Sequence, residues 1–303
     1  MAQAHGPQII SSGRHSEEQI RAAEDLAAVC NRFEGLDLSL DFTPVEPGSI
    51  GRAGQFLCYE GGSLVGFASL YGIAEPELCG MVHPDHRRKG IGMALFDAAR
   101  EECRRRGLLS FELACEEASE SGRAFVAAVG ARYLYSEYGM VLDPAAVDRS
   151  RPRHEDLMMR RAGPEDAGAL AHIVALAENM SEEQVRRTVE RGMGSSIQRY
   201  YIATLRGEPV GTLRVSQHDP STYITAFAVL PGHQGRGYGR QMLIDTIDML
   251  LAEKRHDIRI EVETENRNAY SLYRSCGFRE AHTYGYYLVT LDEGREQTTD
   301  DGR

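Results

Sequence analysis

The sequence predicts a mixed α/β fold built from two domains of similar architecture. The chain has 303 residues, and at about 100–200 residues per domain this length suits two domains or one large one. A segment with a glycine-rich motif occurs twice, each time between a strand pattern and a helix pattern. Helices and strands follow the same order in both halves, which is typical of a layered α/β architecture.

The repeat matches the segment MVHPDHRRKGIGMALFDAAR, from Met81, with AVLPGHQGRGYGRQMLIDTI, from Ala228. An offset of 147 residues (231 − 84) holds for three pairs: Pro84 with Pro231, Gly90 with Gly237, and Gly92 with Gly239. YGMVL, from Tyr138, also matches YGYYL, from Tyr284. A single repeat of this length indicates a duplicated domain and not a solenoid.

The elements of each copy follow in order along the chain. Each copy starts with a helical region, EEQIRAAEDLAAVC in the first and ALAHIVALAEN with SEEQVRRTVERG in the second. A hairpin follows, FLCYEGGSLVGFASL or YYIATLRGEPVGTLRV, whose turns suit short loops. A strand, the glycine motif, a helix, a strand, a short helix and two strands complete each copy. A charged stretch with two prolines at 143–156 predicts a linker between domains at 15–145 and 155–291.

Composition excludes several classes of function. A net charge of −11 disfavours nonspecific nucleic-acid binding and weakly favours a cationic partner such as an amine, although acidity is also ordinary for a soluble protein. The six cysteines form no Cys-x-x-Cys pair, so we expect neither disulfides nor zinc, and a reducing cytoplasm. His83 and His86 lack a third metal ligand. We find no signal-like N-terminus and no apolar run long enough for a membrane span.

The glycine motif itself reads Gln234-Gly-Arg-Gly237-Tyr-Gly239, between the strand ITAFAVL and the helix RQMLIDTIDMLLAEK. Glycines at such a junction let the backbone approach a ligand closely. Their N–H groups, beside the positive end of the helix dipole, form a cradle for a pyrophosphate. The spacing fits neither a Rossmann site nor a P-loop. An ordinary turning loop is the alternative, and the second occurrence of the motif disfavours it.

Two motifs carry a resemblance to a known family. Arg87-Arg-Lys-Gly90-Ile-Gly92 and the motif of the second copy both resemble the acyl-CoA pyrophosphate motif of the GNAT (N-acetyltransferase) superfamily. The family's second motif, Asn-x-x-Ala-x-x-Leu-Tyr-x-x-x-Gly-Phe, is matched by Asn266, Ala269, Leu272, Tyr273, Gly277 and Phe278. The resemblance covers most of residues 155–290 and, more weakly, about 20–143.

The resemblance implies acetyl-CoA as co-substrate and two GNAT-like acyl-CoA-binding domains. Acyl-CoA would lie in a notch where the motif strand splays from the next strand, with the N–H near Val229 at the thioester oxygen. The implied cofactor-binding residues are Val82, Arg87, Arg88, Lys89, Gly90, Ile91 and Gly92 in the first copy, and Val229, Gln234, Gly235, Arg236, Gly237, Tyr238, Gly239 and Arg240 in the second.

Two further side chains receive roles from the resemblance. Asn266 would contact the pantetheine arm or its neighbouring water, or it would simply cap a helix, which Asn does well; both roles can hold together. Tyr273 would be the general acid, because a phenol with a pKa of about 10 is protonated at neutral pH and can reprotonate a departing thiolate. The alternative for Tyr273 is an aromatic ring packed on the sheet.

The first copy differs at the positions of the second motif. Ser119 replaces Asn266, and Gly122 replaces Ala269. Val126 replaces Tyr273 and cannot donate a proton. We therefore expect the N-terminal domain to keep the phosphate loop without catalysing, unless another residue or solvent supplies the proton.

The general base is not assigned by the sequence. Many family members carry a Glu six residues before the Val of the motif strand, and this position is Tyr223. The remaining candidates, each of which can equally be a solvated surface group, are His218, Asp219, Glu261 and Glu263.

We expect an N-acyltransferase that moves an acetyl group to a primary amine of a small molecule or peptide, as a monomer or a homodimer. A noncatalytic acyl-CoA-binding or regulatory protein is the alternative. Mycothiol synthases, two-domain members of the superfamily with a degenerate N-terminal copy, have a similar layout, but they carry a glutamate where this chain has Tyr223.

Overall fold

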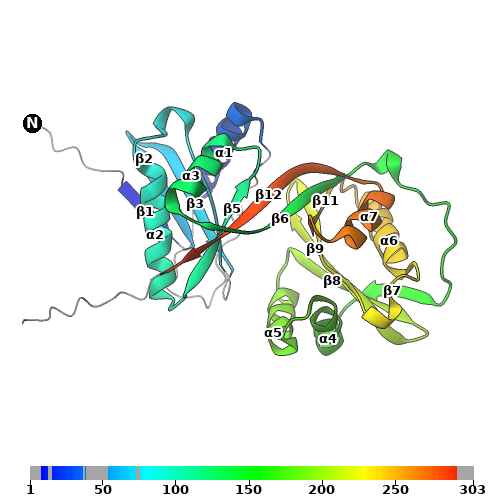
Figure 1. Ribbon diagram of the computed structural model, residues 1–303. Helices are drawn as coiled ribbons and strands as arrows, with labels where there is room; N and C mark the ends of the chain where they lie inside the picture. The colour runs from blue at the N-terminus through cyan, green and yellow to red at the C-terminus, as the bar shows by residue number, and fades with distance from the viewer. Residues whose placement is uncertain (1–7, 13–15, 37, 39–53, 73–75, 292–303) are drawn as a thin grey trace, which may run out of the picture. The chain divides into compact units, whose positions relative to one another are not determined.

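The computed structural model of the chain describes residues 8–12, 16–36, 38, 54–72 and 76–291. The chain divides into two compact units, which we call unit 1 (Met1–Ser136 with His282–Arg303) and unit 2 (Glu137–Ala281). Each unit consists of a mixed sheet with helices packed against it, as the sequence predicts (Figure 1). Among the described residues, no helix has both the length and the apolar character needed to cross a membrane.

The sheet of unit 1 has the strand order β1-β2-β3-β4-β5-β12. Only β4 and β5 run parallel, and the other neighbours are antiparallel. The elements are β1 (Gln8–Ser12), α1 (Glu17–Glu34), β2 (Gln55–Glu60), β3 (Ser63–Tyr71), β4 (Glu77–Val82), α2 (Ile91–Arg105), β5 (Ser110–Glu116), α3 (Glu120–Val129) and the end of β12 (Phe278–Thr290).

The sheet of unit 2 has the order β6-β11-β10-β9-β8-β7, again with one parallel pair, β10 and β11. The elements are the end of β6 (Arg132–Leu142), β7 (Leu157–Arg161), α4 (Ala167–Glu178), α5 (Glu182–Met193), β8 (Gln198–Leu205), β9 (Glu208–His218), β10 (Ser221–Val229), α6 (Tyr238–Ala252), β11 (Asp257–Glu263) and α7 (Arg267–Ser275). Short 3-10 turns at Pro84–His86 and Pro231–His233 precede α2 and α6.

The final strand of each copy pairs outside its own copy. Residues 137–141 of β6 pair with β11 in unit 2, and residues 284–290 of β12 pair with β5 in unit 1. The matched sequences YGMVL and YGYYL lie in these two exchanged strand ends. The predicted domains at 15–145 and 155–291 follow the order of the repeat in the sequence. The compact units have other boundaries, because the end of β6 belongs to unit 2 and the end of β12 belongs to unit 1.

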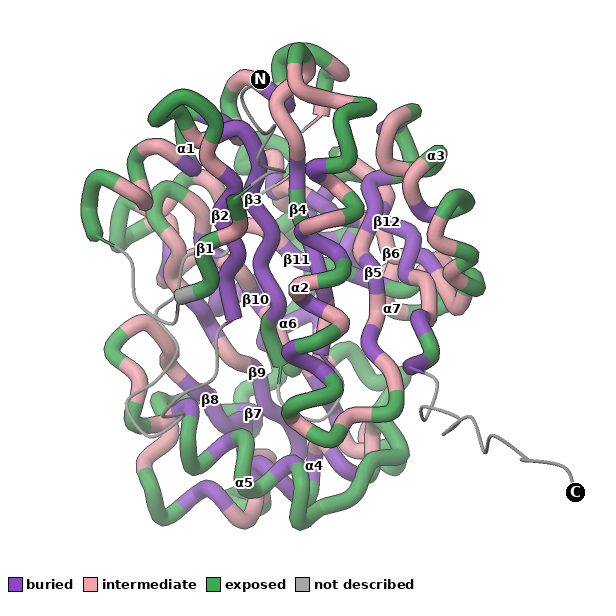
Figure 2. The backbone as a smooth tube through the Cα atoms, turned by 90° about the vertical axis from the view of Figure 1, so that its left-hand side faces the viewer, coloured by how far each residue is buried: buried purple, intermediate pink, exposed green. Residues whose placement is uncertain are grey.

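Each sheet is covered on both faces by apolar packing. In unit 1, α2 packs Leu95 and Phe96 against β5, and α1 packs Leu26 against the opposite face. In unit 2, α6 and α7 cover one face and α4 and α5 the other. Figure 2 shows the strands of both sheets as mostly buried and the outer faces of the helices as exposed. This alternation matches the helix and strand periodicities of the sequence.

Candidate active site

The parallel strands of unit 2 separate part of the way along their length. β10 pairs with β11 only from Ser221 to Ile224. β10 then follows β9 alone, and its register with β9 shifts between Thr225 and Ala228, where Ala226 has a φ of 46°. A bulge of this kind bends a strand and re-aims it. The end of β10 therefore diverges from β11, and the two strands border a notch.

Unit 1 has the same arrangement. β4 pairs with β5 only at Glu77 and Leu78 and then diverges. A cavity of about 620 Å³ opens at this point, between the end of β4, β5, α1 and the N-terminal ends of α2 and α3. Apolar side chains dominate its lining, among them Phe67, Met81, Leu113 and Phe125.

The glycine loops of the two units have nearly the same backbone. Gly90 and Gly237, the N-caps of α2 and α6, have φ and ψ of 85° and −4° and of 86° and −4°. Two residues earlier, Arg88 has a φ of 62° where Gly235 has 72°. Because all four residues lie in the left-handed region, successive N–H groups turn toward one place, as in an anion-binding nest. Both loops therefore retain the cradle that the sequence predicts.

Packing within the protein does not explain Gly90 and Gly235 of these loops. A Cβ at Gly90 or Gly235 would meet no heavy atom within 4 Å. At Gly239, in the first turn of α6, a Cβ would lie at ordinary contact distance, 3.4 Å, from Leu272 and Phe227. The absent side chains leave open space in front of a helix N-terminus, which suits a phosphate group. The loop thus fits the diphosphate of coenzyme A.

The N–H of Val229 is directed away from β9. The next residue, Leu230, donates its N–H to Val210 of β9 at 2.9 Å, and N–H groups alternate in direction along a strand. The carbonyl of Val229 points to the same side of the strand as its N–H. This carbonyl accepts a 2.9 Å hydrogen bond from the Gln234 side chain. The backbone of Val229 therefore faces the notch with a donor available.

The first residue of each motif supports its loop in the same way. Arg87 donates from Nε to the carbonyl of Val82 at 3.0 Å, as Gln234 donates to Val229. His83 donates its N–H to Val65 at 2.9 Å, so Val82 also presents its N–H toward the notch of unit 1. The side chains of Arg87 and Gln234 thus tie each loop to the end of the strand that precedes it.

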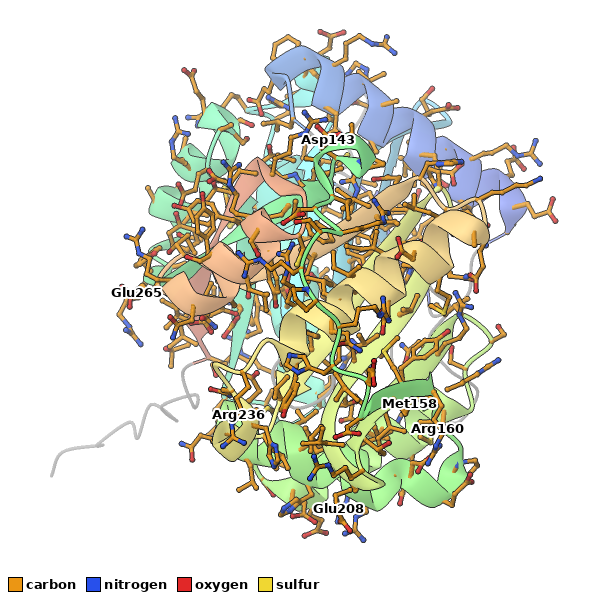
Figure 3. The ribbon with its side chains drawn as sticks, turned by 90° about the vertical axis from the view of Figure 1, so that its right-hand side faces the viewer. Asp143, Met158, Arg160, Glu208, Arg236 and Glu265 are labelled. Carbon is orange, nitrogen blue, oxygen red and sulfur yellow. The ribbon has the colours of Figure 1, made fainter. Side chains whose placement is uncertain are left out.

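Other predicted cofactor-binding residues divide into two groups. Arg88, Lys89 and Arg236 are exposed on the loops, where their charge can reach a phosphate; Figure 3 labels Arg236 on the loop before α6. Ile91 is buried in the core of unit 1, so only its backbone can serve the cradle.

Arg240, which the sequence predicts to be cofactor-binding, has partners for its side chain elsewhere in the protein. Its buried guanidinium donates to the carbonyl of Ser275 at 2.6 Å and to the carbonyl of Asp148 at 2.8 Å. It therefore ties α6 to the end of α7 and to the linker. Tyr238 packs edge-on against His154, whose Nε2 lies 3.1 Å from the position of a Cβ on Gly237. The sequence offered no signal for His154 beside the loop.

Tyr273 lies on α7 with only 6% of its surface exposed. Its ring packs against Phe227 and Phe278, with centroids 6.0 and 6.3 Å away. Among the described residues, its hydroxyl has no hydrogen-bond partner. Burial, with smaller effects from the charges of Glu178 and Cys276, raises the pKa of Tyr273. The phenol therefore stays protonated at neutral and mildly alkaline pH.

Asn266 is the N-cap of α7, where its side chain accepts a 3.1 Å hydrogen bond from the N–H of Ala269. Capping, one of the two roles predicted for this residue, is therefore confirmed. Ser119 caps α3 in unit 1 in the same way, from the N–H of Gly122 at 3.0 Å. The substitution of Asn by Ser thus preserved the helix start.

The candidate bases lie in two regions of unit 2, one far from the notch and one beside it. His218 and Asp219 precede β10, whose other end carries Val229, about 26 Å away at 3.3 Å per residue. The structure therefore does not bring them to the notch. Glu261 and Glu263 follow the point where β10 and β11 separate, on exposed positions of β11. Tyr223 lies within the paired part of β10, opposite Ser216 and Arg259.

The sequence reasoning missed Glu178, a glutamate whose charge acts on Tyr273. Glu178 is the last residue of α4, which packs against β9 and β10. Its charge acts on both Tyr273 and Glu263. Desolvation, and then the charge of Glu263, raise the pKa of Glu178.

In unit 1 the matching region holds a buried polar cluster. Glu34 accepts hydrogen bonds from Ser119 Oγ at 2.7 Å, Ser121 Oγ at 3.1 Å and Arg87 at 2.8 Å. Burial acts to raise the pKa of Glu34, but the hydrogen bonds from the serines and the charge of Arg87 outweigh it, so its pKa is lowered. Val126 is buried in the apolar core and supplies no donor.

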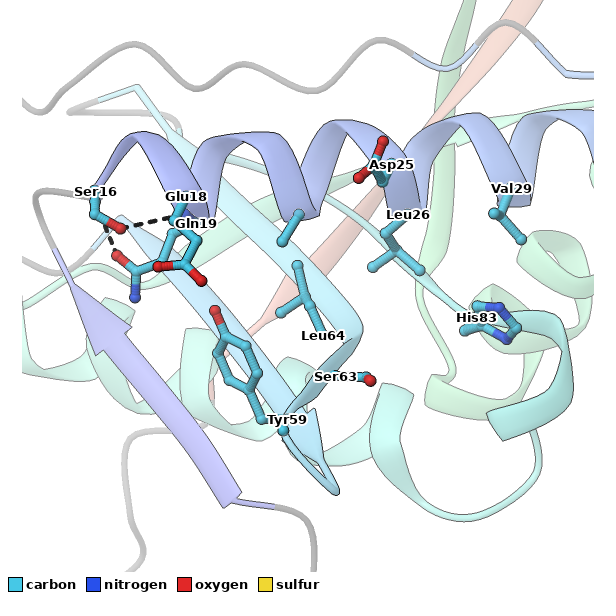
Figure 4. Close-up of a pocket in the computed structure, with 12 residues that line it drawn as sticks. Ser16, Glu18, Gln19, Asp25, Leu26, Val29, Tyr59, Ser63, Leu64 and His83 are labelled. Atoms are coloured by element: carbon cyan, nitrogen blue, oxygen red, sulfur yellow. Dashed lines mark hydrogen bonds between the residues drawn. The ribbon is translucent and has the colours of Figure 1, made fainter.

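A second hollow of unit 1, about 680 Å³, follows α1 and the β2–β3 hairpin (Figure 4). It is lined near the start of α1 by Ser16 and Gln19, which form a capping box, and further along by Tyr59, Leu64 and His83. Ser16 and Gln19 are engaged in capping α1, and the glycine loop does not line this hollow.

Splayed parallel strands and a cradle before a helix, present twice, define this protein as two tandem domains of one fold, each with a site suited to a phosphate-bearing ligand. A model of the acetyltransferase (GNAT) family matches residues 25–131 and 172–278, more than half of the chain. The chain belongs to the acetyltransferase (GNAT) family, and it is an N-acetyltransferase with two such domains in tandem.

The chain is similar in sequence to two acetyltransferases. A mycothiol acetyltransferase of Amycolatopsis mediterranei is 26% identical over 75% of this chain and 80% of its own length. The N-alpha-acetyltransferase RimI of Mycobacterium tuberculosis is 33% identical over 30% of this chain and 58% of its own length. Both names describe acetyl transfer.

Solved structures share the fold over nearly the whole chain. A GCN5-related N-acetyltransferase from Sphaerobacter thermophilus has a TM-score of 0.76 at 17% identity, over 95% of this chain and 96% of its own. A tandem GNAT protein from the clavulanic acid biosynthesis pathway has a TM-score of 0.69 at 18% identity, over 95% and 99%. The predicted α/β fold with two tandem GNAT domains is thereby confirmed.

Proposed function

We propose that unit 2 transfers the acetyl group of acetyl-CoA to a primary amine of a small molecule or peptide, and that unit 1 does not catalyse. The observation that carries the proposal is Tyr273, a buried phenol on the helix that follows the notch strand β11, whose hydroxyl has no hydrogen-bond partner in the described part of the chain. Its counterpart in unit 1 is Val126, which has no proton to give.

The residues of unit 2 divide the work between binding and proton transfer. The amides from Gly235 to Gly239 hold the diphosphate at the N-terminus of α6, and Gln234 braces the loop. Bound acetyl-CoA supplies an acyl group activated as a thioester. The N–H of Val229 stabilises the negative charge that develops on the acyl oxygen, and a preorganised donor of this kind contributes about 3–4 kcal/mol. Tyr273 gives its proton to the departing sulfur.

The expected acceptor is inferred from the family and from the similar proteins. GNAT acetyltransferases act on amines, and the acetyltransferases to which this chain is similar are named for mycothiol and for α-amino groups. The acidic net charge of −11 suits a cationic acceptor. We therefore expect an amine that is protonated in solution, in a small molecule or at a peptide N-terminus.

Thiol release with Ellman's reagent tests the proposal. Acetyl-CoA is offered with a panel containing an amino sugar, the des-acetyl form of mycothiol and a peptide with a free N-terminus. Tyr273→Phe keeps the ring that packs on Phe227 and Phe278 and removes only the donor, so we expect kcat to fall about 100-fold with unchanged affinity for CoA. An unaltered rate in Tyr273→Phe, or tight binding of acetyl-CoA without turnover of any amine, contradicts the proposal; the second result favours a noncatalytic acyl-CoA-binding protein.

A further inference from the structure

The first helices of the two copies end in the same way. α1 ends at Glu34 and is followed by Gly35 with φ 69° and ψ 36°. α4 ends at Glu178 and is followed by Asn179 with φ 54° and ψ 45°. When the two helix ends are aligned, two pairs of buried residues also coincide, Ala23 with Ala167 and Leu26 with Leu170. Glu34 and Glu178 are therefore equivalent positions of the repeat.

Glu34 shows where this helix ending directs its last side chain. The carboxylate reaches the N-terminus of α3, where Ser119 and Ser121 donate to it, and it pairs with Arg87 of the glycine loop. Only 12% of the Glu34 side chain is exposed. The helix end thus aims its glutamate into the notch of its own unit.

Unit 2 presents the same glutamate without these partners. The position of Arg87 is held by Gln234, which is neutral and already donates to Val229. Asn266 caps α7 with its own side chain. Among the described residues, Glu178 makes no hydrogen bond and no ion pair. Glu178 is exposed at the end of α4, and its charge acts on the hydroxyl of Tyr273 and on Glu263, which places the carboxylate in the neighbourhood of the phenol of the active site.

We propose that Glu178 is the general base of unit 2 and takes the proton of the acceptor's ammonium group. The proposal rests on the function proposed above, and it fills the role that Tyr223 leaves vacant on β10. Tyr273 and Glu178 then form an acid–base pair whose members come from α7 and α4. A carboxylate without a cation is free to accept a proton, whereas Glu34, held by Arg87 and two serines, is not.

The protons balance as follows. Glu178 takes one proton from the ammonium, and the neutral nitrogen then forms its bond to the acyl carbon. The carbon–sulfur bond breaks with its electron pair on sulfur, and Tyr273 gives the sulfur a proton. The nitrogen loses its second proton, which restores the Tyr273 hydroxyl through solvent, while Glu178 releases the first proton to water. The net products are an amide, a thiol and one proton.

The surroundings of Glu178 set the pH dependence. The titratable groups whose charges act with it are Glu263 and the Tyr273 hydroxyl. Desolvation and the charge of Glu263 raise its pKa toward the working range, where a base is most effective. The active form is the carboxylate, so kcat/KM should rise with pH through this pKa and then level off.

The test compares Glu178→Gln with Glu34→Gln, the same change at the equivalent position of unit 1. The probes are the best amine of the panel and hydroxylamine, a weakly basic nucleophile that is unprotonated at neutral pH and needs no base. With the amine, Glu178→Gln should lose about 100-fold in kcat/KM and the acidic limb of its pH profile. With hydroxylamine it should keep the wild-type rate, and Glu34→Gln should keep both rates per folded molecule.

Three results would overturn the inference while the proposed function stands. One is a wild-type pH profile in Glu178→Gln. Another is an equal loss with amine and hydroxylamine, which indicates a positioning role. The third is loss of the acidic limb in Glu263→Gln and not in Glu178→Gln. Failure of the proposed function is distinguished from these, because it requires that Tyr273→Phe retain full activity or that no amine react with the wild type.

Discussion

The guanidinium of Arg87 donates to the carboxylate of Glu34 at 2.8 Å, and this ion pair ties the glycine loop of unit 1 to its first helix. The equivalent positions of unit 2, Gln234 and Glu178, form no such pair among the described residues. The same two sites of the repeat thus carry a structural contact in one unit and a free carboxylate in the other. The two copies therefore place charge differently beside loops of nearly identical backbone.

Replacement of Glu34 by Gln should destabilise unit 1 at neutral pH. Because the folded pKa of Glu34 is lowered, its ionised form stabilises the fold above the unfolded pKa of about 4.3, and this contribution is lost as pH falls through the folded pKa. Removing one partner of a largely buried pair should cost about 1–3 kcal/mol at pH 7. Calorimetric unfolding at pH 7 and pH 3 measures the difference, which should shrink at the lower pH.

Glu178→Gln is the matched control for this effect. The pKa of Glu178 is raised, so its charge opposes folding above the unfolded pKa, and the variant should lose no stability at pH 7. Equal destabilisation by the two variants would show that Glu34 and Arg87 do not act as described.

Substitution at Gly237 should abolish use of acetyl-CoA by unit 2. Gly237→Asn keeps a residue type that tolerates a φ of 86°, yet its side chain would enter the cradle beside His154. We expect the KM for acetyl-CoA in thiol release to rise at least 100-fold. Gly235→Arg is the control, because unit 1 carries Arg88 there with nearly the same φ, and its KM should change only a few-fold. Wild-type KM in Gly237→Asn would contradict the assignment of the loop.

Arg240 should matter for stability and not for recognition of the co-substrate. Its buried guanidinium holds Ser275 and Asp148, so Arg240→Ala leaves these carbonyls without a donor and should cost about 3 kcal/mol. Thermal unfolding measures this loss, and the KM for acetyl-CoA of the folded fraction should stay near the wild-type value. A selective rise in KM without loss of stability would instead support a cofactor-binding role of the Arg240 side chain.

A phenol placed in unit 1 should not create a second active site. Val126 and Phe96 both line the cavity of unit 1, so Val126→Tyr places a phenol at the wall of this cavity. Glu34 remains held by Arg87, so no free base accompanies the new hydroxyl. In a Tyr273→Phe background, thiol release should therefore stay at the level of the single variant. A clear gain of turnover would show that unit 1 lost only its acid.

The sequence predicted those features that depend on local pattern. The glycines at 90 and 237, the cap at Asn266 and the strand–loop–helix order follow from backbone preferences and periodicity, which neighbouring residues specify. Glu178 escaped notice because nothing in ALAHIVALAEN marks the last glutamate as different from a solvated helix end. The role proposed for Glu178 follows from the hydrogen bonds of Glu34. One of these joins Glu34 to Ser119, which is 85 residues away in the sequence.

Arg240 shows how far the position of a residue in a motif can predict its contacts. Its place two residues after Tyr238 suggested a cofactor-binding role, but a helix carries successive side chains about 100° apart, and the guanidinium of Arg240 faces the linker. Likewise, the similarity of YGMVL and YGYYL could establish that a strand ends each copy, but strand partners are chosen by tertiary packing. Local sequence does not record which sheet such a strand joins.

The exchange of β6 and β12 has a consequence for how this protein is made. Domains generally fold in order from the N-terminus as the ribosome releases them. Here the sheet of unit 1 lacks its last strand until residues 284–290 have been synthesised, although its other strands end at Glu116. The first half of the chain therefore emerges with an open sheet edge along β5, which stays unpaired with β12 until residues 284–290 have left the ribosome.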